Sequence, residues 1–130
     1  MCYADQDASV ENTWVILMHW VMFDIDGTLV DERGQTIDAA MELYHEFVEQ
    51  GARVLIMTAR PQESWRFTVD QLSGLGVEYD LLVFTPAENK TAAKRRLFRV
   101  PLECSVGDLR TDLGFSKYRI LVTRNGLVMV

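Results

Sequence analysis

Two carboxylates stand two residues apart at the end of an apolar run. Asp24 and Asp26 follow Trp20–Phe23, whose bulky and aromatic residues are typical of a β-strand. In an extended backbone, residues i and i+2 project to the same side, so the two carboxylates would face one place. Like charges at that spacing repel unless a cation, or a proton shared with a substrate, offsets them. Magnesium is the expected counter-ion because it takes oxygen ligands and keeps several waters.

Further polar side chains come directly after other apolar runs. Asp108 and Asp112 follow the strand candidate Cys104–Val106, and their spacing of four puts them on one side of a helical turn. Thr58 follows the apolar run Val54–Met57. Open parallel sheets bind ligands outside the carboxyl ends of their strands, so these groups predict a site there for Mg²⁺ and a phosphoryl group.

A basic segment covers residues 90–99 and contains no acid, although the chain has a formal net charge of −6. Its cations are Lys90, Lys94, Arg95, Arg96 and Arg99. We interpret it as a helix with a solvated charged face and with Ala93 and Leu97 turned inward. The alternative is an anion-attracting patch beside the site.

The elements that must position these groups alternate between strands and helices. Residues 37–48 have the apolar period of an amphipathic helix, which Gly51 ends. A second helix is predicted after Pro61, with Trp65, Val69 and Leu72 on its core side. This order predicts an α/β fold, a three-layer Rossmann-like sandwich with a mostly parallel central sheet.

The last strands are also visible in the sequence. Leu81–Phe84 predicts a third buried strand, Arg119–Thr123 a later one, and Asn125-Gly126 a tight hairpin before Leu127–Val130. At 130 residues the chain has room for one domain, so we expect residues 13–130 to form it and residues 1–12 to be a flexible tail.

The sequence gives no sign of a targeting signal or a disulfide framework. The apolar stretch Trp14–Phe23 is too short to span a bilayer and reads as one or two strands. Cys2 and Cys104 lie in no metal-binding pattern, nor do His19 and His45. We expect a cytoplasmic protein in a reducing compartment, with no membrane partner.

At this point the chain resembles a known family, the haloacid dehalogenase-like phosphohydrolases. Asp24–Val30 matches its DxDGT(L/V) motif, and Val54–Thr58 is similar to its second motif, an aliphatic strand ending in Thr or Ser. Residues 107–112 read GDLRTD and are similar to its GDxxxD motif. The resemblance covers roughly residues 20–123, and a lysine between the second and last motifs is expected.

The resemblance implies a mechanism and a ligand set. Asp24 would be the nucleophile that forms an aspartyl-phosphate, and Asp26 the general acid and base. Mg²⁺ would be held by Asp24, the carbonyl of Asp26, Asp108 and Asp112. Thr58 and a lysine would bind the phosphoryl oxygens. Lys90 is preferred to Lys94 as that lysine because it opens the helix, and Arg60 is a further candidate for contact with substrate.

Cap insertions usually set substrate choice in this family, and the sequence has room only for a small hairpin flap at residues 30–37. An open site suits a macromolecular substrate, either a phosphoprotein or a polynucleotide end. The Thr-Ala-Arg-Pro segment loosely resembles members acting on polynucleotide 3′-phosphates, while the acidic balance disfavours nucleic acid. The alternatives are a phosphatase for small phosphometabolites that is closed by a partner subunit in an oligomer, and a non-catalytic phosphate-binding module.

Two other classes use similar residues. A receiver domain carries its phosphate-accepting Asp at a later strand end, where this chain has Met57-Thr58. A Toprim nuclease needs an earlier glutamate motif that this chain lacks.

Overall fold

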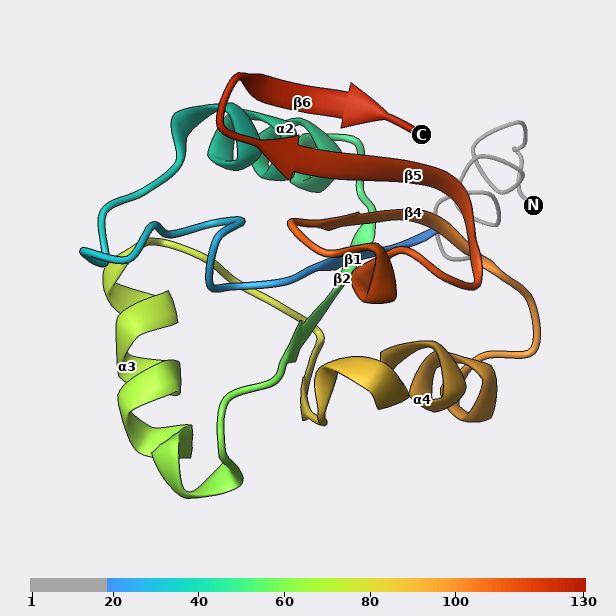
Figure 1. Ribbon diagram of the computed structural model, residues 1–130, viewed down its shortest axis with the longest axis horizontal. Helices are drawn as coiled ribbons and strands as arrows, with labels where there is room; N and C mark the ends of the chain where they lie inside the picture. The colour runs from blue at the N-terminus through green and yellow to red at the C-terminus, as the bar shows by residue number, and fades with distance from the viewer. Residues whose placement is uncertain (1–18) are drawn as a thin grey trace, which may run out of the picture.

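The computed structural model describes residues 19–130 and consists of helices packed on both faces of one sheet (Figure 1). The sheet has the strand order β3-β2-β1-β4-β5-β6. Its strands are β1 (Trp20–Phe23), β2 (Arg53–Thr58), β3 (Leu81–Phe84), β4 (Leu102–Gly107), β5 (Ser116–Thr123) and β6 (Gly126–Met129). All neighbours are parallel except β5 and β6, which form the predicted antiparallel hairpin. The predicted α/β class and its mostly parallel sheet are confirmed.

Two hydrophobic clusters define the layers. The helices are α2 (Asp38–Glu49), α3 (Trp65–Gly74) and α4 (Lys90–Leu97). Tyr44 of α2 and Leu72 of α3 pack with Val21 and Phe23 on one face of the sheet. Met22, between those two residues of β1, points to the other face, where Ala93 of α4 packs near it. The alternation along β1 therefore separates α2 and α3 from α4.

Two turns connect β1 to α2 and β2 to α3. Residues 30–36 form a small hairpin, hereafter the flap, closed by a bridge between Val30 and Thr36. A short 3-10 turn, η1 (Gln62–Ser64), leads into α3. Between β2 and β3 the chain holds only η1, α3 and loops, so the predicted core without a large cap is confirmed. Gly51 ends α2 with φ +86°, as predicted.

The predicted core face of α3 was partly wrong. Leu72 is fully buried and Val69 half-buried, but Trp65 is 50% exposed. Trp65 lies on the same helical stripe as Leu72 but in the first turn, ahead of the first buried residue, Thr68. The first turn of α3 therefore lies outside the core, and Arg66 stacks on the Trp65 ring instead.

The prediction for the basic helix was partly wrong: Ala93 packs against the core as predicted, but Leu97 does not face inward. Leu97 is 47% exposed, whereas Lys90 and Lys94 are almost completely buried. These two lysines are four residues apart and therefore share one face of α4. Their ammonium groups donate hydrogen bonds to carboxylates and backbone carbonyls on that side. Arg95, Arg96 and Arg99 are exposed, so only part of the basic run is a solvated surface.

Strand β3 is half-buried rather than fully buried as predicted, because it is an edge strand with a single neighbour, β2. The expected tail, residues 1–12, and the first part of the apolar stretch from Trp14 lie outside the described residues. Within residues 19–130, no helix has the length and apolar character needed to cross a membrane.

Candidate active site

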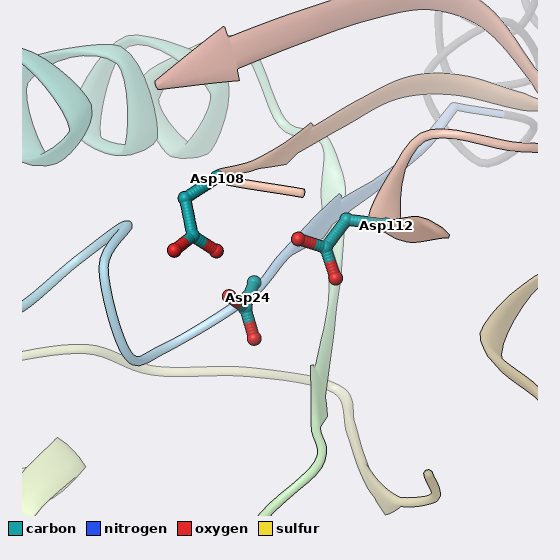
Figure 2. Close-up of side chains that lie close together, drawn as sticks. All are labelled: Asp24, Asp108 and Asp112. Carbon is teal, nitrogen blue, oxygen red and sulfur yellow. The ribbon is translucent and has the colours of Figure 1, made fainter. Parts of the chain in front are cut away.

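Three carboxylates meet at the carboxyl ends of β1 and β4 (Figure 2). One oxygen from each of Asp24, Asp108 and Asp112 lies within 4.8 Å of the others. Asp24 follows β1, Asp108 follows β4, and Asp112 ends the short turn η3 (Arg110–Asp112). Because β1 and β4 are parallel neighbours, their ends bring residues 84 positions apart to one place. Asp24 and Asp112 are buried, so the three form a concentrated negative charge.

Lys90 partly balances that charge. Its ammonium Nζ donates to Asp24 Oδ1 at 2.9 Å and to Asp112 Oδ1 at 2.6 Å, and the side chain is 2% exposed. Burial raises the pKa of Asp24 to about 7; the Lys90 charge opposes this rise and the Asp112 charge adds to it. Burial lowers the pKa of Lys90, but the two carboxylates outweigh it, so the pKa is raised. The lysine therefore stays charged among the acids.

The residues present fit a divalent cation. Three carboxylates against one ammonium leave an excess of negative charge, and oxygen donors are what a hard cation prefers. Gly27 makes the cluster possible, because a Cβ at this position would lie 2.1 Å from Asp108 Oδ2. Gly27 also has φ +79°, in the region that favours glycine.

Asp26 is held by an arginine from the neighbouring strand end. Arg60 Nε donates to Asp26 Oδ2 at 2.8 Å and Nη2 donates to Oδ1 at 2.9 Å, which is a bidentate pair. Arg60 Nη1 donates to Thr68 Oγ1 at 3.1 Å, so both ends of the guanidinium are fixed. The Asp26 side chain remains 60% exposed while that of Arg60 is 13% exposed. Sequence reasoning did not find Thr68, whose only signal was a hydroxyl on the core face of a helix.

Thr58 is fully buried at the end of β2. Its hydroxyl oxygen accepts the backbone N–H of Arg60 at 3.1 Å. The hydroxyl proton is therefore free to be donated elsewhere.

Lys94 lies beneath the acidic cluster, on the inner side of the loop that carries Asp112. Its ammonium donates to the Ser105 hydroxyl at 2.9 Å and to the backbone carbonyls of Asp112 and Gly114. Burial lowers the pKa of Lys94 to about 7. Ser105 also hydrogen-bonds Ser116, which joins β4 to β5 under the loop. Sequence reasoning missed both serines, although Ser105 inside an apolar strand was a signal that a buried polar partner exists.

A cavity of about 360 Å³ opens over the cluster. Five predicted site residues line it: Asp24, Asp26, Arg60, Lys90 and Asp108. Thr58, Lys94 and Asp112 do not line it, and all three are fully buried. The fold thus gathers most of the predicted site and sets Lys94 apart from the opening.

Comparison with known proteins finds a similar family. Residues 21–79 match the family model of haloacid dehalogenase-like hydrolases, a stretch that contains Asp24, Asp26 and Thr58. No curated protein matches the chain significantly. The matched stretch ends before Lys90, Asp108 and Asp112, and the structure brings those three to the residues that the model does cover. The matched segment, the mostly parallel α/β sheet and the acidic strand ends support membership of the haloacid dehalogenase-like hydrolases.

Proposed function

We propose that this protein is a Mg²⁺-dependent phosphatase for phosphate monoesters. One observation carries the proposal: the Asp24 carboxylate lies among two further carboxylates and the Lys90 ammonium, at the floor of an open cavity. A nucleophile beside charges that can neutralise a phosphoryl group is what phosphoryl transfer requires.

Asp24 attacks the phosphorus atom of the substrate. A bond forms between its carboxylate oxygen and phosphorus, and the bond from phosphorus to the alcohol oxygen breaks, which gives an aspartyl-phosphate. Asp26 gives its proton to the departing alcohol oxygen. In the second step Asp26 takes a proton from water, the water oxygen attacks phosphorus, and Asp24 is released.

The bound cation would be held by Asp24, the backbone carbonyl of Asp26, Asp108 and Asp112. When bound, it supplies positive charge that lets a phosphate dianion approach Asp24. Lys90 and the Thr58 hydroxyl proton bind phosphoryl oxygens. The position of Lys90 at the cavity supports it over Lys94 for this role. Arg60, which was predicted to contact substrate, is engaged with Asp26, and we assign it the orientation of that residue.

The flap is the only insertion near the opening among the described residues, which supports a substrate whose own bulk covers the site. A small phosphometabolite would need a lid from a second subunit. A module that only binds phosphate would show no turnover.

Hydrolysis of p-nitrophenyl phosphate with Mg²⁺ and with EDTA tests the proposal. We expect turnover with Mg²⁺, a loss of at least a thousandfold in EDTA, and a similar loss in Asp24→Asn. Asp70→Asn is the matched control, because Asp70 is an exposed carboxylate on α3. Metal-dependent turnover that survives Asp24→Asn removes Asp24 as the nucleophile, and absence of turnover on every phosphate ester favours the binding module.

A further inference from the structure

A second cavity, of about 510 Å³, lies between the flap and α3. Three residues form a wall that it shares with the smaller cavity over the acidic cluster: Asp26, Arg60 and Asp108. Its volume lies in the range of small-molecule sites, roughly 300–1,000 Å³. The roles assigned above leave this cavity without an occupant.

The reaction geometry indicates what occupies it, and this step rests on the proposed function. The phosphate must reach Asp24 in the smaller cavity, and the leaving-group oxygen must lie beside Asp26, which protonates it. Arg60 fixes Asp26 on the wall between the two cavities. The rest of the leaving group therefore extends into the larger cavity.

An exposed aromatic ring, that of Phe67, lines this cavity. Phe67 is 65% exposed although it is a large apolar side chain. The Arg60 guanidinium carbon lies 5.7 Å from the centre of its ring and covers one face. A ring that is held on one face offers the other for stacking against a flat group.

Gln71, one helical turn after Phe67, supplies a polar contact. Its side-chain oxygen is buried and is the one such atom in residues 19–130 with no hydrogen-bond partner. Buried polar atoms almost always have a partner. The last side-chain torsion of glutamine is soft, so its amide is able to turn toward the cavity and accept an N–H or O–H from a ligand.

The charges of the wall favour a neutral leaving group. Four carboxylates and two guanidinium groups line the cavity: Asp26, Asp31, Glu32 and Asp108 against Arg33 and Arg60. A leaving group with its own phosphate or carboxylate groups inside the cavity meets this negative excess.

We propose that the larger cavity binds the nucleoside of a nucleotide monoester. The base stacks on Phe67, an N–H or O–H of the nucleoside donates to Gln71, and the terminal phosphate enters the smaller cavity. The ring of a phosphotyrosine would also stack, but it has no donor for Gln71. A free nucleotide and the phosphorylated end of a polynucleotide both present a terminal nucleoside and its phosphate.

Steady-state hydrolysis with Mg²⁺ tests the proposal. The substrates are adenosine 5′- and 3′-monophosphates, oligothymidylates phosphorylated at either end, glycerol phosphate and a phosphotyrosine peptide. We expect kcat/KM at least tenfold higher for the best nucleoside ester than for glycerol phosphate and the peptide. Preference for the free or for the oligomeric ester identifies the source of the nucleoside, and either preference supports the proposal.

Phe67→Ala should lower the ratio of nucleoside-ester to glycerol-phosphate kcat/KM about tenfold, because stacking on one base is lost. Trp65→Ala is the matched control, since Trp65 is 50% exposed on the same helix but does not line the cavity. The proposal is overturned if the peptide or glycerol phosphate is the better substrate, if Phe67→Ala keeps the preference, or if Trp65→Ala removes it equally.

Binding of adenosine without phosphate or metal separates this inference from the proposed function. NMR titration of the whole chain should show binding that Phe67→Ala weakens about tenfold and Trp65→Ala leaves unchanged. If adenosine binds in this way while no ester is hydrolysed, the cavity assignment stands and the phosphatase proposal fails. If esters are hydrolysed and adenosine shows no Phe67-dependent binding, the cavity assignment fails alone.

Discussion

At the scale of single residues, the site depends on pairings between side chains that a sequence pattern does not link. Asp26 and Arg60 are 34 positions apart, yet they form a bidentate pair because β1 and β2 are neighbours. Gly27 leaves space for the Asp108 carboxylate, because a side chain at position 27 would collide with it. The hydrogen bonds and spacing of the acids are therefore set by residues that follow other strands.

Arg60→Lys should reduce general-acid assistance more than phosphate binding. Lysine keeps the charge but loses the two parallel hydrogen bonds that orient Asp26. An alkyl phosphate needs a proton on its leaving oxygen, whereas p-nitrophenolate leaves without one. We expect the ratio of kcat for an alkyl phosphate to kcat for p-nitrophenyl phosphate to fall about tenfold or more. Equal losses on both substrates, or a change in KM alone, would contradict this role; Arg66→Lys, at an exposed arginine, is the control.

Gly27→Ala and Gly76→Ala form a matched pair. Both glycines have positive φ, +79° and +75°, so both variants carry backbone strain of about 1–2 kcal/mol. Only at Gly27 would the new Cβ meet Asp108; at Gly76 nothing lies within 4 Å. We expect urea unfolding to show a larger loss of stability for Gly27→Ala, and calorimetry to show weaker Mg²⁺ binding for that variant alone. Unchanged Mg²⁺ affinity in Gly27→Ala would remove Asp108 from the ligand set.

At the scale of elements, α4 contributes two buried lysines with different tasks. Lys90 reaches the carboxylates at the cavity, and Lys94, one turn later, reaches the carbonyls of the loop that holds Asp112. Together they connect one face of α4 to the ends of β1 and β4. The inner side of α4 therefore combines the apolar Ala93 with two buried lysines that donate to the Asp112 loop.

Lys94→Met tests the support of that loop. The substitution leaves the Ser105 hydroxyl and two carbonyls without their donor, so we expect a loss of about 2–4 kcal/mol in the free energy of unfolding. Mg²⁺ binding, measured by calorimetry on the folded variant, should weaken because the backbone carbonyl of Asp112 loses its hydrogen bond to Lys94. Lys117→Met, at an exposed lysine, should change neither quantity. If stability falls and Mg²⁺ affinity does not, Lys94 has only a structural role.

At the scale of the whole molecule, the sheet is the unit that keeps the site together. The proposed nucleophile and metal ligands follow the central strands β1 and β4, whereas Thr58 ends β2 and Arg60 follows it. Both faces of β1 are covered, by α2 and α3 on one side and α4 on the other. Separation of the central strands would dismantle the site and the core together.

Alkylation of the Cys104 thiol measures the separation of the central strands. Cys104 is 2% exposed in β4, and burial raises the pKa of its thiol to about 12. Because only the thiolate reacts, a shift from 9.0 to about 12 makes alkylation at pH 8 about a thousandfold slower than in the unfolded chain. Mass spectrometry of a Cys2→Ser variant treated with iodoacetamide should show labelling only as urea unfolds the sheet. Rapid labelling under native conditions would contradict the buried placement of β4.

The sequence by itself determined the strands, the turns and the acids at the strand ends. These features follow from local rules: apolar runs predict β1, β2 and β4, and Asn125-Gly126 predicts the last hairpin. Parallel strands end on one side of a sheet, so Asp24 and Asp108 had to meet once the fold class was recognised. That inference requires only the direction of the strands and no knowledge of which distant side chains are in contact.

The tertiary structure decided everything that depends on what packs against an element. The period of α4 did not show that its lysines turn inward, because the attraction comes from Asp24, Asp112 and loop carbonyls on other elements. The position of Trp65 on its helix did not show that the core begins one turn later. Arg60 pairs with Asp26 because β1 and β2 are neighbours in the sheet. The order of strands in a sheet leaves no local pattern in the sequence, so this pair was not predictable from it.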